Sequence, residues 1–303
     1  MDNLKVMGGR ISNRITRQYL ESLVLEMRVI DTEEPSTEFE LFGEKFATPV
    51  MTAALSHLEG ICRDGMVEMA RGAAAAGALV WAGLGSDEEL EKMIGTGAKV
   101  VKIIKPYEDP EEVLREIRHA ESCGALAVGM DVDHPFARNG KYMTLEGHKM
   151  AAKSLEDMKG FVRESKLPFI VKGVLSVQDA RKCAEMGAAG MIVSHHNAII
   201  DYAAPPLMVL PEILKAVGGT MPVFVDCCLE SGADVYKAMA LGASAAGVGR
   251  ALMGPLGEKG ADGVKAKIQK ITADLAYLMG MTGCQDVSHF DASVVRYLEN
   301  RMV

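Results

Sequence analysis

The polar residues best placed for chemistry in this chain follow directly on short apolar segments. One such segment ends at Val193, another at Val225 and a third at Val248. The polar residues that follow them are, in order, Ser194-His195-His196, Asp226 and Gly249-Arg250. Polar groups at the carboxyl ends of successive buried strands are typical of the active face of a (β/α)8 barrel. The pattern therefore predicts one shared site at a single rim.

His196 and Asp133 are the candidates for proton transfer. Asp131 and Asp133 flank Val132 at the end of another apolar segment, so their side chains share one face of a strand. If the strands close into a barrel, His196 comes within reach of Asp133, and a histidine held by a carboxylate is a general base of fixed orientation. A loop histidine without chemistry is the alternative. His195 alternates to the other face and is expected to pack behind the site.

Lys172 and Lys102 both lie inside predicted strands and need partners, because an unpaired buried ammonium is very costly. Lys172 could bind a ligand, or it could pair with Asp226 or Asp131. Two carboxylates as close as Asp131 and Asp133 raise at least one pKa unless a cation intervenes, and Lys102 could supply that cation.

Gly249 and Arg250 have the features of a phosphate site. Loops after the last two strands of a barrel commonly bind phosphate through backbone N–H groups and an arginine. The aspartates and histidines of the predicted rim fit no recognised metal-ligand spacing, so we predict no metal.

Eight nearly continuous apolar segments predict strands that are buried on both faces. They are residues 49–53, 78–83, 99–105, 126–132, 169–174, 190–195, 222–227 and 245–249. Helical signals lie between them at residues 64–76, 87–93, 111–122, 176–186, 211–217, 233–241 and 263–279. Eight βα units favour a closed (β/α)8 TIM barrel over an open sheet, and no G-x-G-x-x-G motif supports a dinucleotide fold.

The chain is divided into an N-terminal extension, residues 1–45, and the barrel, residues 46–303. The extension contains one expected helix over residues 12–26 and should cover the bottom or flank of the barrel. The connection at residues 133–145 is the longest on the active face and is a candidate lid.

Composition excludes several classes of partner. The 303 residues carry a net charge of −8, which argues against nucleic acid and against an anionic membrane surface. No apolar run reaches the roughly 18 residues of a membrane span, and residues 1–30 hold no apolar signal core. The six cysteines have no metal-binding spacing and are interpreted as reduced thiols of a cytoplasmic protein.

Several segments together resemble the FMN-dependent α-hydroxy acid oxidases and dehydrogenases. The resemblance is carried by Val171–Val174, Asp179-Ala180, Gly187–Ser194, Pro222–Asp226, Asp234–Ala243 and Gly249-Arg250, with weaker support from residues 25–30 and 41–49. It covers roughly residues 15–295. It implies an oxidoreductase that binds FMN and a small molecule and forms a homo-oligomer, a tetramer or larger.

The resemblance also implies residue roles. His196 would take the substrate proton with Asp133 orienting it, and Lys172 would face the flavin N1/O2 edge, where a positive charge stabilises the reduced form. The implied cofactor contacts are the backbone of Ala53 and Ala54, then Ser194 near the cofactor, Asp226 on the ribityl chain, and Gly249 and Arg250 on the phosphate. Lys102 and Asp131 join this set because they stand where the family has a glutamine and a threonine.

The chain departs from the family where the substrate carboxylate is held. Ile199 stands in place of the arginine that grips the carboxylate, and Ile104 in place of a substrate-facing tyrosine. The glycines and arginine that follow the Asp226 position are replaced by Cys227, Cys228, Leu229 and Glu230. Losing an arginine–carboxylate clamp costs several kcal/mol of binding and orientation, so we expect a substrate other than glycolate or lactate.

Arg138 or Lys141 in the fourth loop could supply a new contact for an anion. Two other readings stay open. One is a redox-neutral barrel enzyme, either an isomerase or a lyase or aldolase with Lys172 as Schiff-base nucleophile. The other is a barrel that has lost FMN and catalysis.

Overall fold

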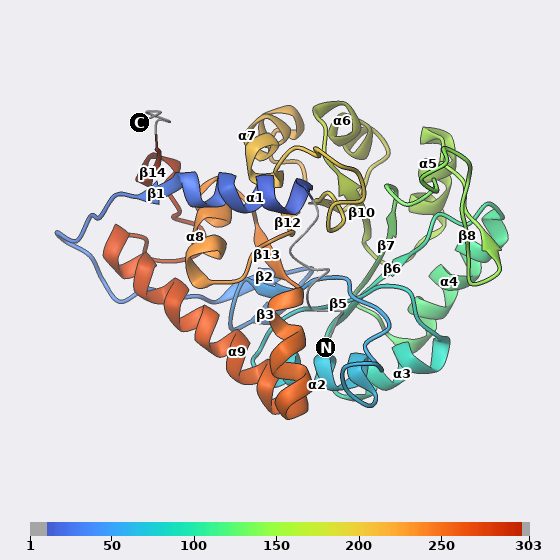
Figure 1. The fold of residues 1–303 in the computed structure, drawn as a ribbon, viewed down its shortest axis with the longest axis horizontal. Helices are drawn as coiled ribbons and strands as arrows, with labels where there is room; N and C mark the ends of the chain where they lie inside the picture. Colours follow the sequence, from blue (N-terminus) through green and yellow to red (C-terminus); the bar gives the residue numbers. More distant parts are fainter. Residues whose placement is uncertain (1–10, 299–303) are drawn as a thin grey trace.

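The computed structural model describes residues 11–298 and contains the predicted (β/α)8 barrel (Figure 1). Its parallel strands are β4 (Val50–Thr52), β5 (Val80–Ala82), β6 (Val100–Ile104), β7 (Ala127–Asp131), β10 (Phe169–Val174), β11 (Gly190–Val193), β12 (Val223–Val225) and β13 (Ala245–Val248). Each of the eight predicted segments thus contains one strand, and the fold prediction is confirmed.

The barrel closes between its first two strands. Seven neighbouring pairs in the order β4-β13-β12-β11-β10-β7-β6-β5 form parallel ladders, and the β10–β11 ladder shifts register between Lys172 and Val174. The last gap is bridged by Thr52 N, which donates to Leu79 O at 3.1 Å, and by a parallel bridge between Leu55 and Ala82. All eight carboxyl ends therefore lie at one rim, as the predicted site requires.

Helices alternate with the strands and surround the barrel (Figure 1). They are α2 (Gly65–Ala75), α3 (Asp87–Gly95), α4 (Pro110–Cys123), α5 (Leu155–Glu164), α6 (Val177–Glu185), α7 (Pro206–Val217), α8 (Gly232–Ala240) and α9 (Met253–Thr282), with a short 3-10 helix at Arg250–Leu252. Ser86 caps α3 through Glu89 N, and Asp109 caps α4 through Glu111 N, because a side-chain oxygen satisfies a free helical N–H. None of these described helices is long and apolar enough to cross a bilayer.

Alternate residues of each strand fill the barrel interior. Leu79, Trp81, Ile103, Ile170 and Phe224 form one buried cluster inside the barrel, separate from the larger layer between strands and helices. The other strand face packs on the helices, which explains why these strands are apolar throughout. The inner face can be traced upward along each strand to the rim, and this alternation decides which polar residues meet there.

The N-terminal segment braces the barrel at both ends. Helix α1 (Ile11–Ser22) is followed by β1 (Leu23–Leu25), which pairs with β14 (Val295–Tyr297), so the predicted helix over residues 12–26 is shorter than expected. The hairpin β2 (Phe39–Leu41) and β3 (Glu44–Phe46) buries its aromatic residues against the lower interior cluster, as the expected bottom cover. The division at residue 45 stays a prediction, and residues 1–10 and 299–303 lie outside the described residues.

Phe224 tests the interior packing. Its ring lies 5.4 Å from that of Trp81, edge to face, and it is fully buried. We expect Phe224→Ala to lower the free energy of unfolding by about 3–5 kcal/mol, because a large cavity is left inside a closed barrel. Phe136→Ala is the matched control, since that ring is 53% exposed. Urea denaturation of both variants measures the difference, and equal losses would contradict the assigned packing.

Candidate active site

A buried carboxylate between two lysines lies at the top of the barrel interior. Lys105 follows directly on β6, Asp131 ends β7 and Lys172 lies within β10, and the sheet register places Lys172 directly beside Asp131. Asp131 Oδ1 accepts from Lys172 Nζ at 2.7 Å, and Oδ2 accepts from Lys105 Nζ at 2.6 Å. All three side chains are less than 10% exposed. Each carboxylate oxygen therefore has its own ammonium partner.

The charges in this trio stabilise each other. Burial alone would raise the pKa of Asp131, but Lys172, His196 and Lys105 outweigh it and hold that pKa far below its usual value. Burial alone would lower the pKa of Lys172, but the carboxylates of Asp131, Asp133 and Asp226 raise it above its usual value. Asp131 and Lys172 are therefore both ionised at neutral pH. A Schiff-base lysine must offer a neutral amine, so this setting opposes that role for Lys172.

His196 and Asp133 meet as the sequence predicts. His196 Nδ1 lies 2.9 Å from Asp133 Oδ1, 3.6 Å from Asp131 Oδ1 and 3.4 Å from Lys172 Nζ. Because a carboxylate only accepts hydrogen bonds, Nδ1 carries the proton toward Asp133 and Nε2 is left as the basic nitrogen. Gly173, with φ +94°, allows this approach, since a Cβ there would overlap the Asp133 carboxylate. The arrangement gives an oriented imidazole beside an ammonium.

The loop that carries His196 has an unusual backbone. His196, Asn197 and Ala198 have φ values of 49°, 54° and 63°, a left-handed run that non-glycine residues rarely adopt. The run is held from inside by Ser194 Oγ, which accepts from His196 N at 3.0 Å. Helix α1 holds it from outside, where Asn13 Nδ2 donates to Asn197 Oδ1 at 2.7 Å.

His195 lies behind the site, as predicted. Its Nε2 is 2.8 Å from Thr16 Oγ1 on α1, and its Nδ1 accepts from Ala198 N at 3.0 Å. Only 1% of the residue is exposed. Its position indicates a structural part in the loop.

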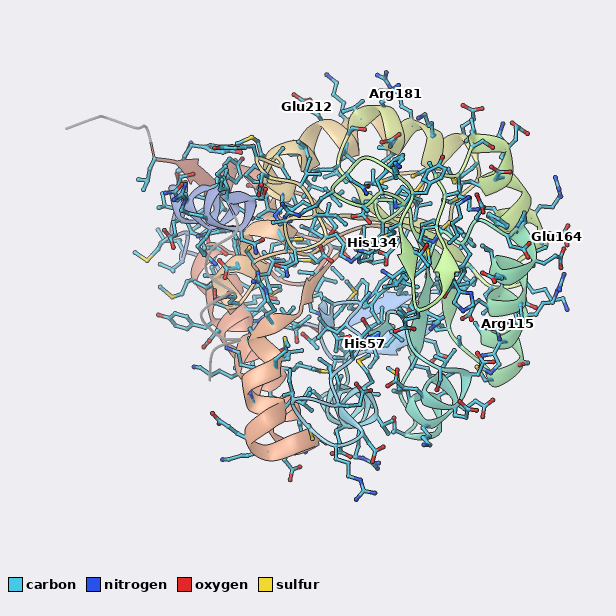
Figure 2. All side chains as sticks on the ribbon, turned by 45° about the vertical axis from the view of Figure 1, so that its right-hand side comes forward. His57, Arg115, His134, Glu164, Arg181 and Glu212 are labelled. Carbon is cyan, nitrogen blue, oxygen red and sulfur yellow. The ribbon has the colours of Figure 1, made fainter. Side chains whose placement is uncertain are left out.

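His134 is a site residue to which the sequence analysis gave no role. Its ring lies 5.0 Å from that of His196, and Figure 2 labels it near the centre of the view, away from Glu164, Arg181 and Glu212 on the outer helices. Its Nδ1 is buried and has no hydrogen-bond partner among the described residues. Burial, with Lys105 and His196 nearby, lowers its pKa to about 4, so the ring is neutral at pH 7. The only sequence signal was its place directly after Asp133.

A cavity of about 240 Å³ extends from Lys172 and His196 to the end of the last barrel strand, β13. Its lining includes seven of the predicted site residues: Ala53, Ala54, Lys172, His196, Asp226, Gly249 and Arg250. Cys227 Sγ donates to Asp226 Oδ1 at 3.0 Å and lies 3.4 Å from Ser194 Oγ, so Ser194 adjoins the same cavity. Arg250 Nη2 donates to Cys228 Sγ at 3.7 Å, and Glu230 also lines the cavity. The cavity thus runs from an ammonium to a guanidinium.

Lys102 does not lie where the sequence analysis expected it. It is on the helix-facing side of β6, where Nζ donates to Gly83 O at 2.8 Å and lies 4.0 Å from Glu116 of α4. The cation beside Asp131 is Lys105. Interior residues of β6 have odd numbers, so the lysine that faces the barrel interior is Lys105 and not Lys102.

The two candidate anion contacts of the fourth loop also lie elsewhere. Arg138 is 79% exposed, and its guanidinium is 4.0 Å from Asp201 of the loop after β11. Lys141 is exposed, and neither residue lines the cavity. The loop instead folds on itself, with Phe136 stacked on Tyr142 and a hairpin of β8 (Thr144–Leu145) and β9 (His148–Lys149).

A metal ion is poorly matched to this site. Ligand atoms of Asp131, Asp133 and His196 lie within 4.8 Å of one another. However, both oxygens of Asp131 already accept from ammonium groups, and a divalent cation would lie beside two positive charges. The charges around Asp131 therefore favour proton transfer by His196 over the binding of a metal ion.

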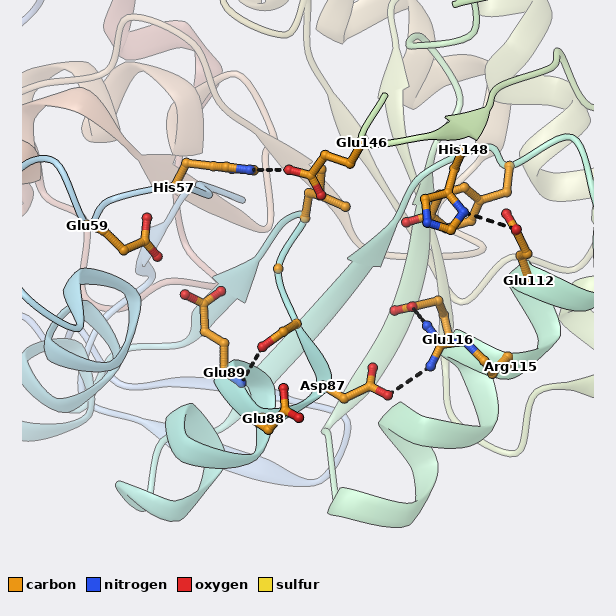
Figure 3. Close-up of a pocket in the computed structure, with 14 residues that line it drawn as sticks. His57, Glu59, Asp87, Glu88, Glu89, Glu112, Arg115, Glu116, Glu146 and His148 are labelled. Carbon is orange, nitrogen blue, oxygen red and sulfur yellow. Dashed lines mark hydrogen bonds and ion pairs between the residues drawn. The ribbon is translucent and has the colours of Figure 1, made fainter. Parts of the chain in front are cut away.

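A second and larger hollow of about 790 Å³ lies beside the barrel strands β5 and β6 (Figure 3). His57 pairs with Glu146 at 2.8 Å and His148 with Glu112 at 3.0 Å, so its polar groups tie the β8–β9 hairpin to neighbouring segments. Burial and the nearby Glu59 raise the pKa of Glu89 in its wall. None of the predicted catalytic residues lines it.

His134 predicts a pH dependence of stability. Its pKa is about 4 in the folded chain and about 6.5 when unfolded, so the unfolded chain binds more protons between these values. Acidification from pH 7 to 4.5 should therefore destabilise the fold, by about 1–2 kcal/mol from this residue after allowance for its partial exposure. His134→Phe should remove that part of the pH dependence.

Urea denaturation at several pH values measures the effect, and His289→Phe is the control because His289 is exposed. An identical pH profile for wild type and His134→Phe would contradict the assignment.

The chain is similar to known flavoenzymes. A family model described as FMN-dependent dehydrogenase matches residues 6–154 and 139–297. The 4-hydroxymandelate oxidase of Amycolatopsis orientalis is 30% identical over 92% of this chain and 88% of its own. The glycolate oxidase of Spinacia oleracea is 28% identical over 88% and 82%. A mandelate oxidase variant, solved with a C4a-OH-FMN adduct, superposes with a TM-score of 0.88 at 30% identity, covering 97% of this chain and 94% of that one.

Proposed function

The chain belongs to the family of FMN-dependent dehydrogenases, and from this premise we propose that it oxidises a hydroxyl-bearing substrate whose proton is taken by His196. The observation that carries the proposal is the 2.9 Å contact between His196 Nδ1 and Asp133 Oδ1 on the wall of a cavity that Lys172 also lines. An oriented base beside a hydride acceptor is what oxidation of an alcohol carbon needs.

The residues of the cavity fit FMN. Arg250 at one end supplies a cation for a phosphate, and Lys172 at the other end supplies one for the electron-rich edge of the ring. Between them Gly249 leaves room, since a Cβ there would lie 3.1 Å from the Ala53 Cβ. We assign Ala53, Ala54, Ser194 and Asp226 to the rest of the cofactor. When bound, FMN accepts the hydride.

His196 and Asp133 would move the substrate proton in the following way. Nε2 of His196 accepts the hydroxyl proton, and Asp133 stabilises the positive charge that the ring then acquires. The His134 ring lies 5.0 Å from the His196 ring and stays neutral, so it adds no competing charge. The left-handed loop and its hydrogen bonds keep the imidazole from rotating away.

The charge balance argues for a substrate that is uncharged where relatives bind a carboxylate. Lys105, Lys172, Asp131 and Asp133 sum to zero, and each lysine already donates to Asp131. Ile199 supplies no charge, and Arg138 is directed to Asp201. Among residues 11–298, these side chains leave no unpaired cation for the carboxylate of a 2-hydroxy acid such as glycolate or lactate, whereas an amide, ester or alcohol requires none.

The rim adds an apolar surface beside this site. Phe136, Tyr142, Ile200 and Tyr202 are all more than 40% exposed, on two loops that the Arg138–Asp201 contact brings together. We propose that they contact an apolar group of a substrate larger than lactate.

Among the alternatives, the Schiff-base lyase or aldolase is opposed by the raised pKa of Lys172. A redox-neutral flavin enzyme would use the same residues, and stoichiometric reduction of the bound flavin by substrate distinguishes it. Glu230 and the Cys227-Cys228 pair favour weakened FMN binding, which a titration with FMN tests.

His196→Ala tests the proposed base. Anaerobic mixing with matched 2-hydroxy acids, their amides and their esters should bleach the flavin absorbance of the wild type near 450 nm, fastest with the uncharged compounds. The variant should keep FMN and lose about 10²–10⁴-fold in reduction rate, the range for a general base. His57→Ala, on the second hollow, is the control. Unchanged reduction in His196→Ala would remove this residue from the role.

Arg250→Ala tests the phosphate end of the cavity. Loss of a charge-assisted hydrogen bond costs about 1.5–3 kcal/mol, so the Kd for FMN should rise about tenfold to a hundredfold. Arg181→Ala on the outer face of α6 is the matched control and should leave Kd unchanged (Figure 2). Fluorescence titration of the apoprotein measures both, and equal affinities would move the phosphate elsewhere.

A further inference from the structure

We propose that Asp131 and Lys105 together act as positioning residues that set the reduction potential of the bound FMN and the affinity of the site for anions. The inference rests on the proposed placement of FMN next to Lys172. It concerns a carboxylate in contact with Lys172 and an ammonium in contact with that carboxylate.

The ammonium of Lys172 is paired with a carboxylate. Its Nζ lies 2.7 Å from Asp131 Oδ1, and both side chains are 3% exposed or less. In such a dry setting, a carboxylate in contact with an ammonium cancels most of its field at a third group a few ångströms away. Asp131 therefore reduces the positive charge that Lys172 offers to reduced FMN or to an anionic ligand.

Lys105 restores part of the positive charge that Asp131 cancels at Lys172. It donates to the other oxygen of Asp131 at 2.6 Å, so the carboxylate is shared between two ammonium groups. The trio has a net charge of +1, whereas Lys172 and Asp131 alone would have none. The register of β6 and β7 ends at the pair Ile104 and Met130, and Lys105 and Asp131 are the next residues along the two chains. The effect on Lys172 therefore depends on both residues.

Neutralising Asp131 and neutralising Lys105 should change the FMN potential and the affinity for anions in opposite directions. Positive charge beside the ring favours reduced FMN and also favours binding of an anion there. Removing the charge of Asp131 should raise both the potential and the anion affinity. Removing the charge of Lys105 should lower both. A purely structural role would instead weaken FMN binding or stability in both variants without opposite shifts.

The experiment measures the FMN midpoint potential and the Kd for sulfite, a small anion that bleaches oxidised flavin when it binds, on the FMN-loaded protein. For Asp131→Asn we expect sulfite to bind at least about tenfold more tightly, which for a two-electron couple corresponds to a potential about 30 mV higher. For Lys105→Met we expect sulfite to bind more weakly, by at least about threefold, and the potential to fall.

A double variant and a control variant complete the experiment. Asp131→Asn leaves two buried ammonium groups without their partner and could release FMN, whereas Lys105→Met keeps the Lys172–Asp131 pair intact. The double variant restores the net charge of +1 and should return both measurements close to wild type. Lys149→Met is the control, because Lys149 is 55% exposed and pairs with Glu108 outside the cavity.

The outcomes separate this inference from the proposed function. Opposite shifts with a near-normal double variant support it. Unchanged potential and sulfite affinity in Lys105→Met, or shifts of the same sign in both single variants, overturn it while leaving the FMN site in place. A wild-type protein that takes up no FMN would refute the proposed function and this inference with it.

Discussion

The contact on which the site depends is the sharing of one buried carboxylate by two buried ammonium groups. Asp131 lies between Lys105 and Lys172 at the ends of adjacent strands, and its carboxylate offsets the buried charge of both lysines. Their mutual stabilisation fixes Lys172 against the cavity and leaves Asp133 to orient His196. The barrel supplies the register that brings the three strands to the same height.

The eight strands and the His196–Asp133 pair could be predicted from the sequence because both follow from simple rules. Parallel strands inside helices are apolar on both faces, and polar residues that end them meet at one rim. Helix α5 was missed because its segment is mostly polar, with Gly160 in its middle, although Ser154 and Asp157 form a capping box. Helix α7 begins at Pro206, five residues before its predicted start, and continues through Pro211.

Lys105 was missed for a different reason. The segment 99–105 contains three lysines at intervals of three residues, and a one-residue error in register exchanges the inner and outer faces. Only the pairing of β6 with its neighbours shows that Lys102 faces α4 and Lys105 faces the interior. The His134 environment also depends on tertiary contacts, because neither its ring contact with His196 nor its low pKa has a local sequence signal.

Helix α1 contacts the loop at residues 194–203 at several points. Ser12 Oγ donates to Ile200 O at 2.6 Å and accepts from Ala203 N, while Asn13 holds Asn197. Glycine residues would adopt this left-handed turn without strain, but the loop has none at residues 196–198. Hydrogen bonds from α1, which precedes the first barrel strand in the sequence, hold the turn instead. A substitution that destabilises the loop around His196 can thus be compensated by a substitution in α1, and the reverse also holds.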